Sequence, residues 1–473
     1  MGTEAHLPST APRGSIGAAS GTYGCGATMI DITPILVPFR DRLPTRSIVI
    51  ARNALGRLTS ECARHLPPGL LLVVADPITA QVAGQAVARA CTSGRNPTTL
   101  LVLHPQGATL IADEAKVHEL QSHIAAMNRR PAAAIAVGAG TVNDIVKLAT
   151  FRSGMPYAVV PTAPSMNGYT SPIAAILVDG VKTVQDCHMP LAVTADVDIL
   201  AAAPQRMIAA GFGDLISKPV SNADWLLSNH LIGSRYVPDV LALVQESVRC
   251  MQGIAPRLRK HDPDAIARLT AALLLSGFAM GLAGTSAPAS GGEHLISHYL
   301  DMAHYAFGTS NDFHGCQVGV ATRVTAMLYE QLICFSPDSI DIDARLCALQ
   351  AWDVYESVLR SHFAVLAQAV IPHARQLYPT GDELRHRLHN VRAAWPRLMA
   401  ALRPGLIPGS AILHDLSAAG CPIRFRDLGI SPDSARSAIL FAKDVRSRYT
   451  VLHLAWEFGM LERWTDQILP DVC

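Results

Sequence analysis

Histidines gather within residues 290–319 of this 473-residue chain, in the segment SGGEHLISHYLDMAHYAFGTSNDFHGCQVG. His294 and His298 are one helical turn apart, so both rings would leave the same face of a helix. His304 is expected on another face, and His314 follows inside an HGCQVG turn. Imidazoles gathered among small residues, which let a ligand approach the backbone, predict a divalent-metal site.

Asp214, in the motif GFGDLISK, offers a carboxylate for the same site. Two imidazoles and one carboxylate form the ligand set of a catalytic metal site, because coordination positions remain open for substrate. Two alternatives stay open, since Asp214 could instead be a helix N-cap and the histidines could be hydrogen-bonded core residues. Cys316, beside His314, is a further candidate zinc ligand, although no second cysteine is near it in the sequence.

The motif VGAGTVND, from Val137 to Asp144, follows an expected strand and opens an expected helix. Its glycines would let the backbone approach a pyrophosphate, and a helix N-terminus offers free N–H groups and a positive dipole end. The motif is not the G-x-G-x-x-G fingerprint, so a glycine-rich turn without a ligand is the alternative.

Two further segments follow expected strands. Asp76 ends the strand LLLVVAD, where its carboxylate could accept a ribose hydroxyl or cap the next helix. Residues 161–172, PTAPSMNGYTSP, are dense in hydroxyl and amide groups, which favours a ligand-binding loop over an ordinary turn.

Composition excludes several classes of protein. The formal net charge of +1, without a Lys/Arg block, argues against nucleic-acid binding. Ten cysteines without a CxxC pair are typical of reduced thiols in a cytoplasmic protein. No uncharged apolar run of about 18 residues predicts a membrane span, and the N-terminus lacks the apolar region of a signal peptide. Residues 1–28 are expected to form a disordered tail.

Apolar runs alternate with helical windows over residues 29–203, which predicts an α/β domain with an open, mostly parallel sheet that binds a dinucleotide. A second, all-α domain that binds metal and substrate is expected over residues 204–473, with a cleft between the two domains. The expected strands are 47–51, 70–75, 99–103, 132–137, 157–160 and 173–178. The expected helical windows of the second domain are 265–283, 319–332, 347–377, 382–402 and 432–442.

Five ordered motifs resemble those of glycerol-1-phosphate dehydrogenases: GAGTVND, PTAPSMNGYTSP, GFGDLISKPVSNADW, SGGEHLISH and HGCQVGVAT. The C-terminal stretch AKDVRSRYTVLHLAWEFGMLE resembles the bacterial branch of that family. The resemblance covers residues 30–465 and implies the fold shared by iron-type alcohol dehydrogenases, glycerol dehydrogenases and dehydroquinate synthases.

The resemblance also implies roles for individual residues. Asp214, His294 and His314 would bind the metal, zinc or nickel, while Asn167, Asp214 and His298 would contact the substrate. Asp76 would lie near the adenosine ribose. The remaining residues expected to bind NAD(H) or NADP(H) are Gly138, Ala139, Gly140, Thr141 and Val142 at the pyrophosphate, and Thr162, Ala163, Pro164, Ser165 and Ser171 at the nicotinamide.

Two residues depart from the family pattern. Relatives carry Asp where this chain has Asn167, and an aromatic residue where it has Pro219. Asn keeps an acceptor oxygen, loses the charge and gains two donor hydrogens. Asn167 could therefore direct the site toward another keto or hydroxy phosphate, or toward a different polar head.

The implied activity is hydride transfer between NAD(P)(H) and dihydroxyacetone phosphate or sn-glycerol 1-phosphate, or a closely related keto or hydroxy phosphate. His298 or water would supply the proton. One alternative is a metal- and NAD-dependent cyclase or lyase of the dehydroquinate synthase kind, and another is a non-catalytic nucleotide-binding relative. A cytoplasmic homo-oligomer, most simply a dimer, is expected, acting on a small phosphorylated polyol or ketone in phospholipid metabolism without nucleic acid or membrane insertion.

Overall fold

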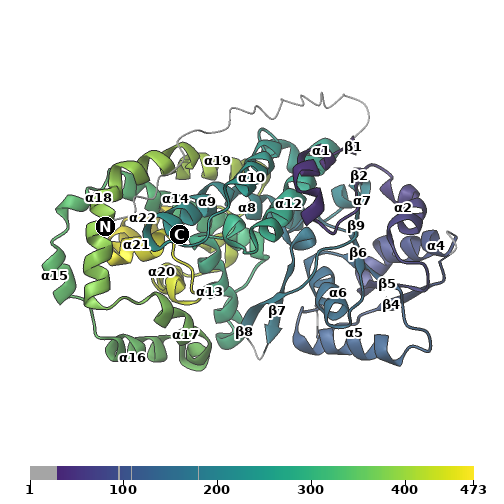
Figure 1. Ribbon diagram of the computed structural model, residues 1–473, viewed down its shortest axis with the longest axis horizontal. Coiled ribbons are helices and arrows are strands. Elements are labelled where there is room, and N and C mark those ends of the chain that lie inside the picture. Colours follow the sequence, from purple (N-terminus) through teal and green to yellow (C-terminus); the bar gives the residue numbers. More distant parts are fainter. Residues whose placement is uncertain (1–28, 94–95, 108, 179–180) are drawn as a thin grey trace, which may run out of the picture.

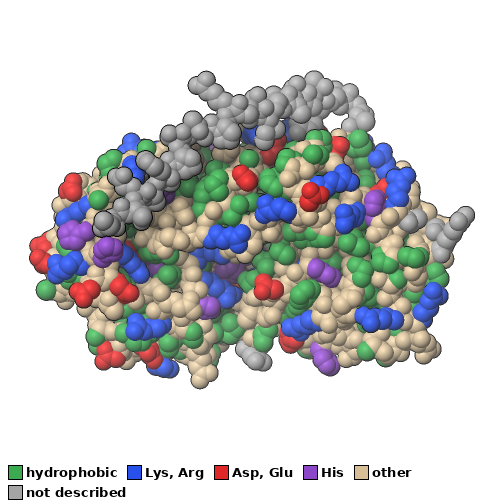
Figure 2. All heavy atoms as spheres, in the orientation of Figure 1, with side chains coloured by type: hydrophobic (Ala, Val, Ile, Leu, Met, Phe, Trp, Pro, Cys, Tyr) green, Lys and Arg blue, Asp and Glu red, His purple; other side chains and the backbone are tan. Residues whose placement is uncertain are grey.

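The computed structural model describes residues 29–93, 96–107, 109–178 and 181–473 (Figure 1). An α/β half and a helical half lie side by side along the long axis of the molecule. The expected tail, residues 1–28, lies outside the described residues. Basic and acidic side chains are interspersed on the face in Figure 2, in keeping with the net charge of +1.

A seven-stranded sheet in the order β1-β2-β9-β6-β5-β3-β4 organises the α/β half. Only β1 runs antiparallel to its neighbour. The central strands are apolar throughout because both of their faces are buried, as the sequence pattern predicted. The strands are β1 (Met29–Ile30), β2 (Ser47–Ala51), β3 (Leu71–Ala75), β4 (Thr98–Val102), β5 (Ala133–Gly138), β6 (Tyr157–Pro161) and β9 (Ala192–Asp196).

Alternate residues of one strand enter different cores. Leu72 and Val74 of β3 pack with α5 (Glu114–Ala126) and α6 (Gly140–Arg152), in the core that continues into the helical half. Leu71 and Val73 pack on the other face with α2 (Leu58–His65) and α4 (Gln85–Ser93). The sheet thus has helices on both faces, which confirms the α/β class predicted from the sequence.

One expected strand lies outside the main sheet. Residues 173–178 form β7 (Ile173–Val178), but β7 pairs antiparallel with β8 (Val181–Asp186) in a separate hairpin. A connection of only two residues cannot carry the chain back to a parallel position, which needs a long crossover. The sheet position between β2 and β6 belongs to β9, which was not predicted. The other expected strands are confirmed to within one residue at each end.

The described chain after Pro204 contains helices and no strand, as predicted. The window 347–377 is two helices, because the chain turns at Ala364, whose φ is 45°. The main helices are α8 (Gln205–Ile216), α9 (Lys218–Ile232), α10 (Pro238–Cys250), α12 (Pro263–Ala283), α13 (Gly292–Phe307), α14 (His314–Cys334), α16 (Trp352–Phe363), α17 (Ala367–Leu377), α18 (Gly381–Leu402), α19 (Gly409–Ala419), α20 (Pro432–Phe441), α21 (Val451–Glu457) and α22 (Leu461–Val472).

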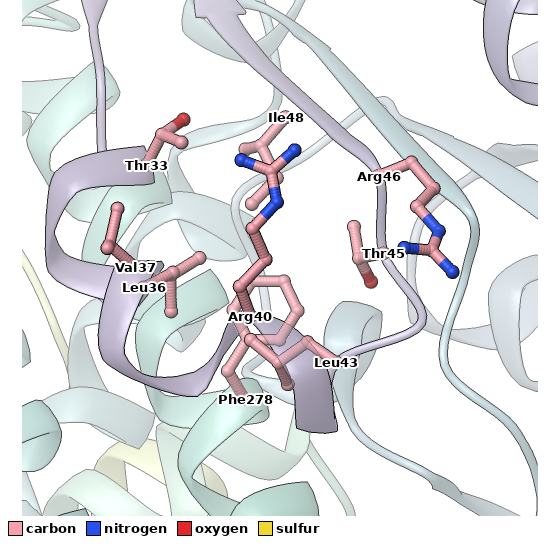
Figure 3. A pocket seen from close by; sticks show the side chains of 9 residues that line it. All are labelled: Thr33, Leu36, Val37, Arg40, Leu43, Thr45, Arg46, Ile48 and Phe278. Carbon is pink, nitrogen blue, oxygen red and sulfur yellow. The ribbon is translucent and has the colours of Figure 1, made fainter.

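Helix α12 lies at the centre of the molecule. Of the helices in the described residues, it alone is long and apolar enough to cross a membrane, but 89% of its most apolar window is buried inside the fold. It is therefore placed as a core helix. Its Phe278 faces the N-terminal segment across a small hollow of about 50 Å³ beside Arg40 and Leu43 (Figure 3), which none of the candidate site residues lines.

Glycines bring α8 and α14 into backbone contact. A Cβ at Gly213 of α8 would lie 2.1 Å from the carbonyl oxygen of Gly315, and a Cβ at Gly315 would lie 1.8 Å from that of Ala210. Neither position has space for a side chain. This close approach places Asp214, next to Gly213, beside His314, next to Gly315.

The backbone contact predicts a stability defect in Gly213→Ala. Overpacking against a carbonyl that cannot move should lower the free energy of unfolding by about 2–3 kcal/mol, measured by urea denaturation. Gly381→Ala is the matched control, because a Cβ at this helical glycine meets nothing within 4 Å. An unchanged free energy of unfolding in Gly213→Ala would contradict the packing described here.

Candidate active site

A cleft of about 330 Å³ lies between the two halves of the molecule. The α/β half contributes residues that follow the carboxyl ends of β5 and β6, where parallel sheets bind their ligands. The helical half contributes His298 and His314. The expected cleft between sheet and helices is therefore present, and the histidines face the glycine motif across it.

The glycine motif forms the start of α6. Ala139, Gly140 and Thr141 line the cleft, and no side chain caps the helix N-terminus at Ala139. Gly138 and Val142 lie behind them, where a Cβ at Gly138 would come within 2.6 Å of Val142. The free N–H groups at the end of a 13-residue helix suit a phosphate.

Asp76 is an N-cap. Its Oδ1 accepts hydrogen bonds of 2.8 Å from the amides of Ile78 and Thr79, which begin α3 (Pro77–Thr79). This confirms the capping alternative. Oδ2 takes no part in the cap, so contact between Asp76 and a ribose hydroxyl stays a prediction.

The loop at 161–172 turns only part of its polar surface to the cleft. Ser165 lines the cleft, whereas Thr162, Ala163 and Pro164 are buried. Ser171 is fully buried. The structure therefore does not bring the Ser171 hydroxyl to the cleft.

Lys147 of α6 holds this loop and was missed in the sequence. Its buried ammonium donates to the carbonyl oxygens of Gly168 at 2.5 Å and Ile173 at 2.9 Å, and to Ser171 Oγ at 3.3 Å. Burial lowers the pKa of Lys147, against the opposing effect of the nearby Asp144. A lysine inside the apolar run IVKLA was the available signal for such a role.

Asp214 lies in the last turn of α8, so it is not an N-cap. Lys218 Nζ donates to its Oδ1 at 3.0 Å, and Asn167 donates its backbone N–H to Oδ2 at 3.0 Å and its side-chain Nδ2 to Oδ1 at 3.2 Å. Burial alone would raise the pKa of Asp214, but the nearby Lys218 ammonium outweighs it and holds that pKa well below its usual value. The carboxylate is therefore ionised at neutral pH.

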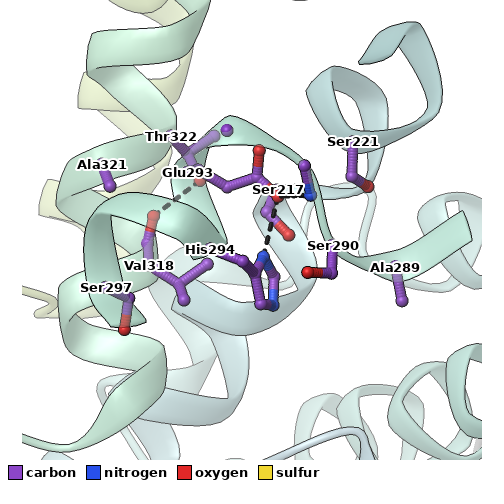
Figure 4. A network of polar contacts seen from close by, with 12 residues as sticks. Ser217, Ser221, Ala289, Ser290, Glu293, His294, Ser297, Val318, Ala321 and Thr322 are labelled. Atoms are coloured by element: carbon purple, nitrogen blue, oxygen red, sulfur yellow. Dashed lines mark hydrogen bonds and ion pairs between the residues drawn. The ribbon is translucent and has the colours of Figure 1, made fainter. Parts of the chain in front are cut away.

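His294 presents one free ring nitrogen to that carboxylate. Its Nδ1 lies 2.7 Å from Oε1 of the buried Glu293, which also accepts the amide of Gly291 (Figure 4). A neutral His294 ring that donates its Nδ1 proton to Glu293 carries its lone pair on Nε2. Nε2 lies 3.6 Å from Asp214 Oδ1, longer than a hydrogen bond.

His314 is arranged in the same way. It is the first residue of α14, so the expectation of a turn at this position was wrong. Its Nδ1 lies 3.0 Å from Ser297 Oγ, which donates its own proton to Gln317 at 2.9 Å. The His314 ring therefore donates from Nδ1 and keeps a lone pair on Nε2. Burial, then Lys182, holds the pKa of His314 well below its usual value.

His298 completes the group. Its ring centroid lies 6.5 Å from that of His294 and 5.6 Å from that of His314, and the latter two are 5.2 Å apart. Its Nδ1 is buried without a hydrogen-bond partner in the described part of the chain. Burial, then the charge of Arg446, lowers the pKa of His298 well below its usual value. It is a neutral imidazole at the wall of the cleft.

This donor set fits a divalent metal. Two ligand atoms on one tetrahedral zinc lie about 3.3 Å apart, close to the 3.6 Å between Asp214 Oδ1 and His294 Nε2. Glu293 and Ser297 orient the two rings as the outer partners of metal-binding histidines do. Among the described residues, no three His, Cys, Asp or Glu side chains yet converge into a full ligand shell. A full ligand shell would therefore require these side chains to rotate toward a common point.

Other candidates lie elsewhere. The Cys316 thiol faces the carbonyl oxygen of Arg206 at 3.8 Å, and burial raises its pKa to about 12. His304 bonds the carbonyl oxygen of Thr309 and not the other rings, as expected of a residue on another face. Neither residue lines the cleft.

Comparison with known proteins defines the class. The family model described as iron-containing alcohol dehydrogenase matches residues 49–204. A crystal structure of glycerol dehydrogenase from Schizosaccharomyces pombe superposes with a TM-score of 0.59 and 14% identity, over 90% of this chain and 91% of that one. A probable glycerol dehydrogenase from Sinorhizobium meliloti gives 0.55 and 14%, over 90% and 98%. The fold is that of the iron-containing alcohol dehydrogenases.

Sequence relatives define the family within that class. The glycerol-1-phosphate dehydrogenase [NAD(P)+] of Halalkalibacterium halodurans is 38% identical over 284 residues, 59% of this chain and 70% of the relative. The protein of the same name from Bacillus subtilis is 30% identical over 414 residues, 87% and 91% of the two chains. The chain belongs to the glycerol-1-phosphate dehydrogenase family, which confirms the resemblance found in its motifs.

The ligand geometry predicts the effect of His294→Ala. Loss of one of three ligands should weaken zinc affinity by about 100-fold or more, so that metal-replete protein retains far less than one equivalent by mass spectrometry. Glu293→Gln should weaken it by about 10–100-fold, through the Nδ1 contact alone. His123→Ala is the control, since this residue is exposed on α5. A full equivalent in His294→Ala would remove His294 from the ligand set.

The lowered pKa values of His298 and His314 predict how stability depends on pH. Below about pH 6.5 the unfolded chain takes up protons at these rings and the folded chain does not, so metal-free protein loses stability as pH falls. The loss is at most about 1.4 kcal/mol per pH unit for each ring. Urea denaturation at pH 7.5 and 5.5 should show a smaller loss in His298→Asn than in wild type or His123→Asn. An equal loss in all three would contradict a neutral, buried His298.

Proposed function

We propose that the protein is an NAD(P)-dependent, metal-dependent oxidoreductase that interconverts dihydroxyacetone phosphate and sn-glycerol 1-phosphate. One observation carries the proposal: the buried Asp214 and His294 lie beside His314, which lines the cleft opposite the free amides that begin α6. The names of the relatives support the same reaction.

Asp214, His294 and His314 would hold the metal, zinc or nickel, and residues 138–142 would hold the pyrophosphate of NAD(P). When bound, the metal polarises the substrate carbonyl while the nicotinamide exchanges a hydride with its carbon. Lys218 keeps Asp214 ionised, and Glu293 keeps the lone pair of His294 directed at the site. Of the residues expected to contact the nicotinamide, Ser165 is the one that lines this cleft.

His298 would transfer the proton. The ring is neutral at pH 7, so it has a lone pair that can accept the hydroxyl proton of glycerol 1-phosphate during oxidation. In the reverse direction, the protonated His298 ring would return a proton to the substrate oxygen as the ketone is reduced. Its position in the cleft wall, beside His294 and His314, supports this role.

Asn167 changes the charge beside the substrate. It donates two hydrogen bonds to Asp214, so the position adds a donor where relatives carry a second carboxylate. A second carboxylate 3.2 Å from Asp214 would compete with it for a proton. The substitution therefore leaves Asp214 fully ionised and available to a metal.

Two alternatives are not favoured by the relatives, because the similar proteins of Halalkalibacterium halodurans and Bacillus subtilis are both named glycerol-1-phosphate dehydrogenase. A cyclase would return NAD unchanged after each cycle. A non-catalytic relative would have no need for two imidazoles whose tautomers are fixed by Glu293 and Ser297. We further propose that the enzyme uses NAD(H) or NADP(H), and that it is a cytoplasmic dimer.

The proposed reaction predicts stoichiometric loss of reduced-nicotinamide absorbance with dihydroxyacetone phosphate, in the presence of zinc or nickel, and none after chelation. NADH and NADPH are compared in the same assay. His298→Asn should lower kcat by about 10²–10⁴-fold while leaving bound metal unchanged. Product formation without net nicotinamide oxidation would favour the cyclase, and no turnover with any metal or cofactor would favour the non-catalytic relative.

A further inference from the structure

A second cavity, of about 180 Å³, also has His298 in its wall. It is lined by Ser286 and Ser290, which precede α13, and by Arg446 and Arg448, which follow α20. His298 lines both this cavity and the cleft. A small molecule that reaches from the cleft past the His298 ring would enter a chamber with two guanidinium groups.

The guanidinium of Arg448 is used in hydrogen bonds within the protein. It donates 2.6 Å hydrogen bonds to the carbonyl oxygen of Ser290 and to Ser286 Oγ. Burial lowers its pKa to about 10, although Glu293 acts in the opposite direction. Arg448 therefore fixes the cavity wall next to the metal-binding helix.

Arg446 has unused donors. Its Nη2 donates to the carbonyl oxygen of Lys182 at 2.6 Å, while Nε and Nη1 make no hydrogen bond within the described part of the chain. No carboxylate of the described residues lies within 4 Å of either arginine as an ion pair. Burial is the sole cause that lowers the pKa of Arg446, without an acidic group to offset it.

A partly buried guanidinium without a counter-ion selects for an anion. Its remaining N–H groups form a planar fork that matches two oxygens of a phosphate. Lys182, the cation that lines the cleft itself, is already paired with Asp301 at 2.5 Å. Arg446 is thus the cation with free hydrogen-bond donors and no counter-ion, so a bound dianion would stabilise it most.

We propose that Arg446 binds the phosphate group of the substrate in this second cavity, with Arg448 as the positioning residue that holds the segment in place. The inference rests on the proposed function, because it extends the three-carbon substrate from the metal ligands past His298. The same segment, 442–462, was singled out in the sequence only for its likeness to relatives, with no role assigned.

The test compares a phosphorylated substrate with its unphosphorylated counterpart in the metal-loaded enzyme. Wild type, Arg446→Met, Arg446→Lys and Arg463→Met are assayed with dihydroxyacetone phosphate and with dihydroxyacetone. Arg463→Met is the control, since this arginine is exposed on α22 and lines neither cavity. Inorganic phosphate, titrated by calorimetry into the same four proteins, gives a readout that does not depend on turnover.

Arg446→Met should raise KM for dihydroxyacetone phosphate by at least about tenfold and reduce the preference over dihydroxyacetone by the same factor. It should also lose most of its affinity for inorganic phosphate, with partial recovery in Arg446→Lys and wild-type behaviour in Arg463→Met. Thermal melting shows whether each variant is folded. If Arg446→Met does not fold, the phosphate affinity and substrate preference of Arg446→Lys test the proposal instead.

The proposal is overturned if Arg446→Met and Arg446→Lys keep both the wild-type preference for the phosphorylated substrate and the wild-type affinity for phosphate. That result leaves the proposed reaction standing, because wild type still turns over dihydroxyacetone phosphate. If wild type instead accepts only dihydroxyacetone and binds no phosphate, the proposed substrate class itself fails.

Discussion

Two electron-rich atoms face each other in a buried space: Asp214 Oδ1 and His294 Nε2, 3.6 Å apart. With the proton of a neutral His294 donated to Glu293 from the other ring nitrogen, the two atoms repel each other unless a cation lies between them. Lys218 offsets the carboxylate from one side only. The arrangement is best satisfied by a divalent metal, and most other features of the site keep these atoms in place.

The positions of these atoms depend on backbone packing. Asp214 reaches the histidines because α8 and α14 touch through Gly213 and Gly315, where no side chain fits. The rings then take their orientation from Glu293 and Ser297, which lie on the same helix as His294. The helical half therefore builds the metal-binding side of the cleft, and the α/β half supplies the free amides that suit a dinucleotide.

Much of the fold was predictable from the sequence, because apolar runs in buried parallel strands have few other interpretations. The exceptions have physical causes. Residues 173–178 have the composition of a sheet strand, but their partner is decided by the short connection to β8. Strand β9 is as long as its neighbours but ends in a polar Thr-Ala-Asp sequence, so its apolar run was too short to predict.

The residues of the candidate site could be predicted where they stand in a short sequence motif. Asp214 and the histidines stand in recognisable motifs, and the structure brings them together. Lys147 and Ser171 show the limit, because their polar atoms face each other inside the protein and only tertiary structure reveals that orientation. Arg446 is the clearest case, since it lies about 150 residues from His298 in sequence and meets it only after the helices have packed.

The most direct test is a crystal structure of the zinc-loaded protein, with anomalous scattering recorded on both sides of the zinc absorption edge. The account predicts one strong peak about 2.0–2.2 Å from a carboxylate oxygen of Asp214 and from Nε2 of both His294 and His314. A peak bound by other residues, or Asp214 still held only by Lys218 and Asn167 with zinc in excess, would contradict it.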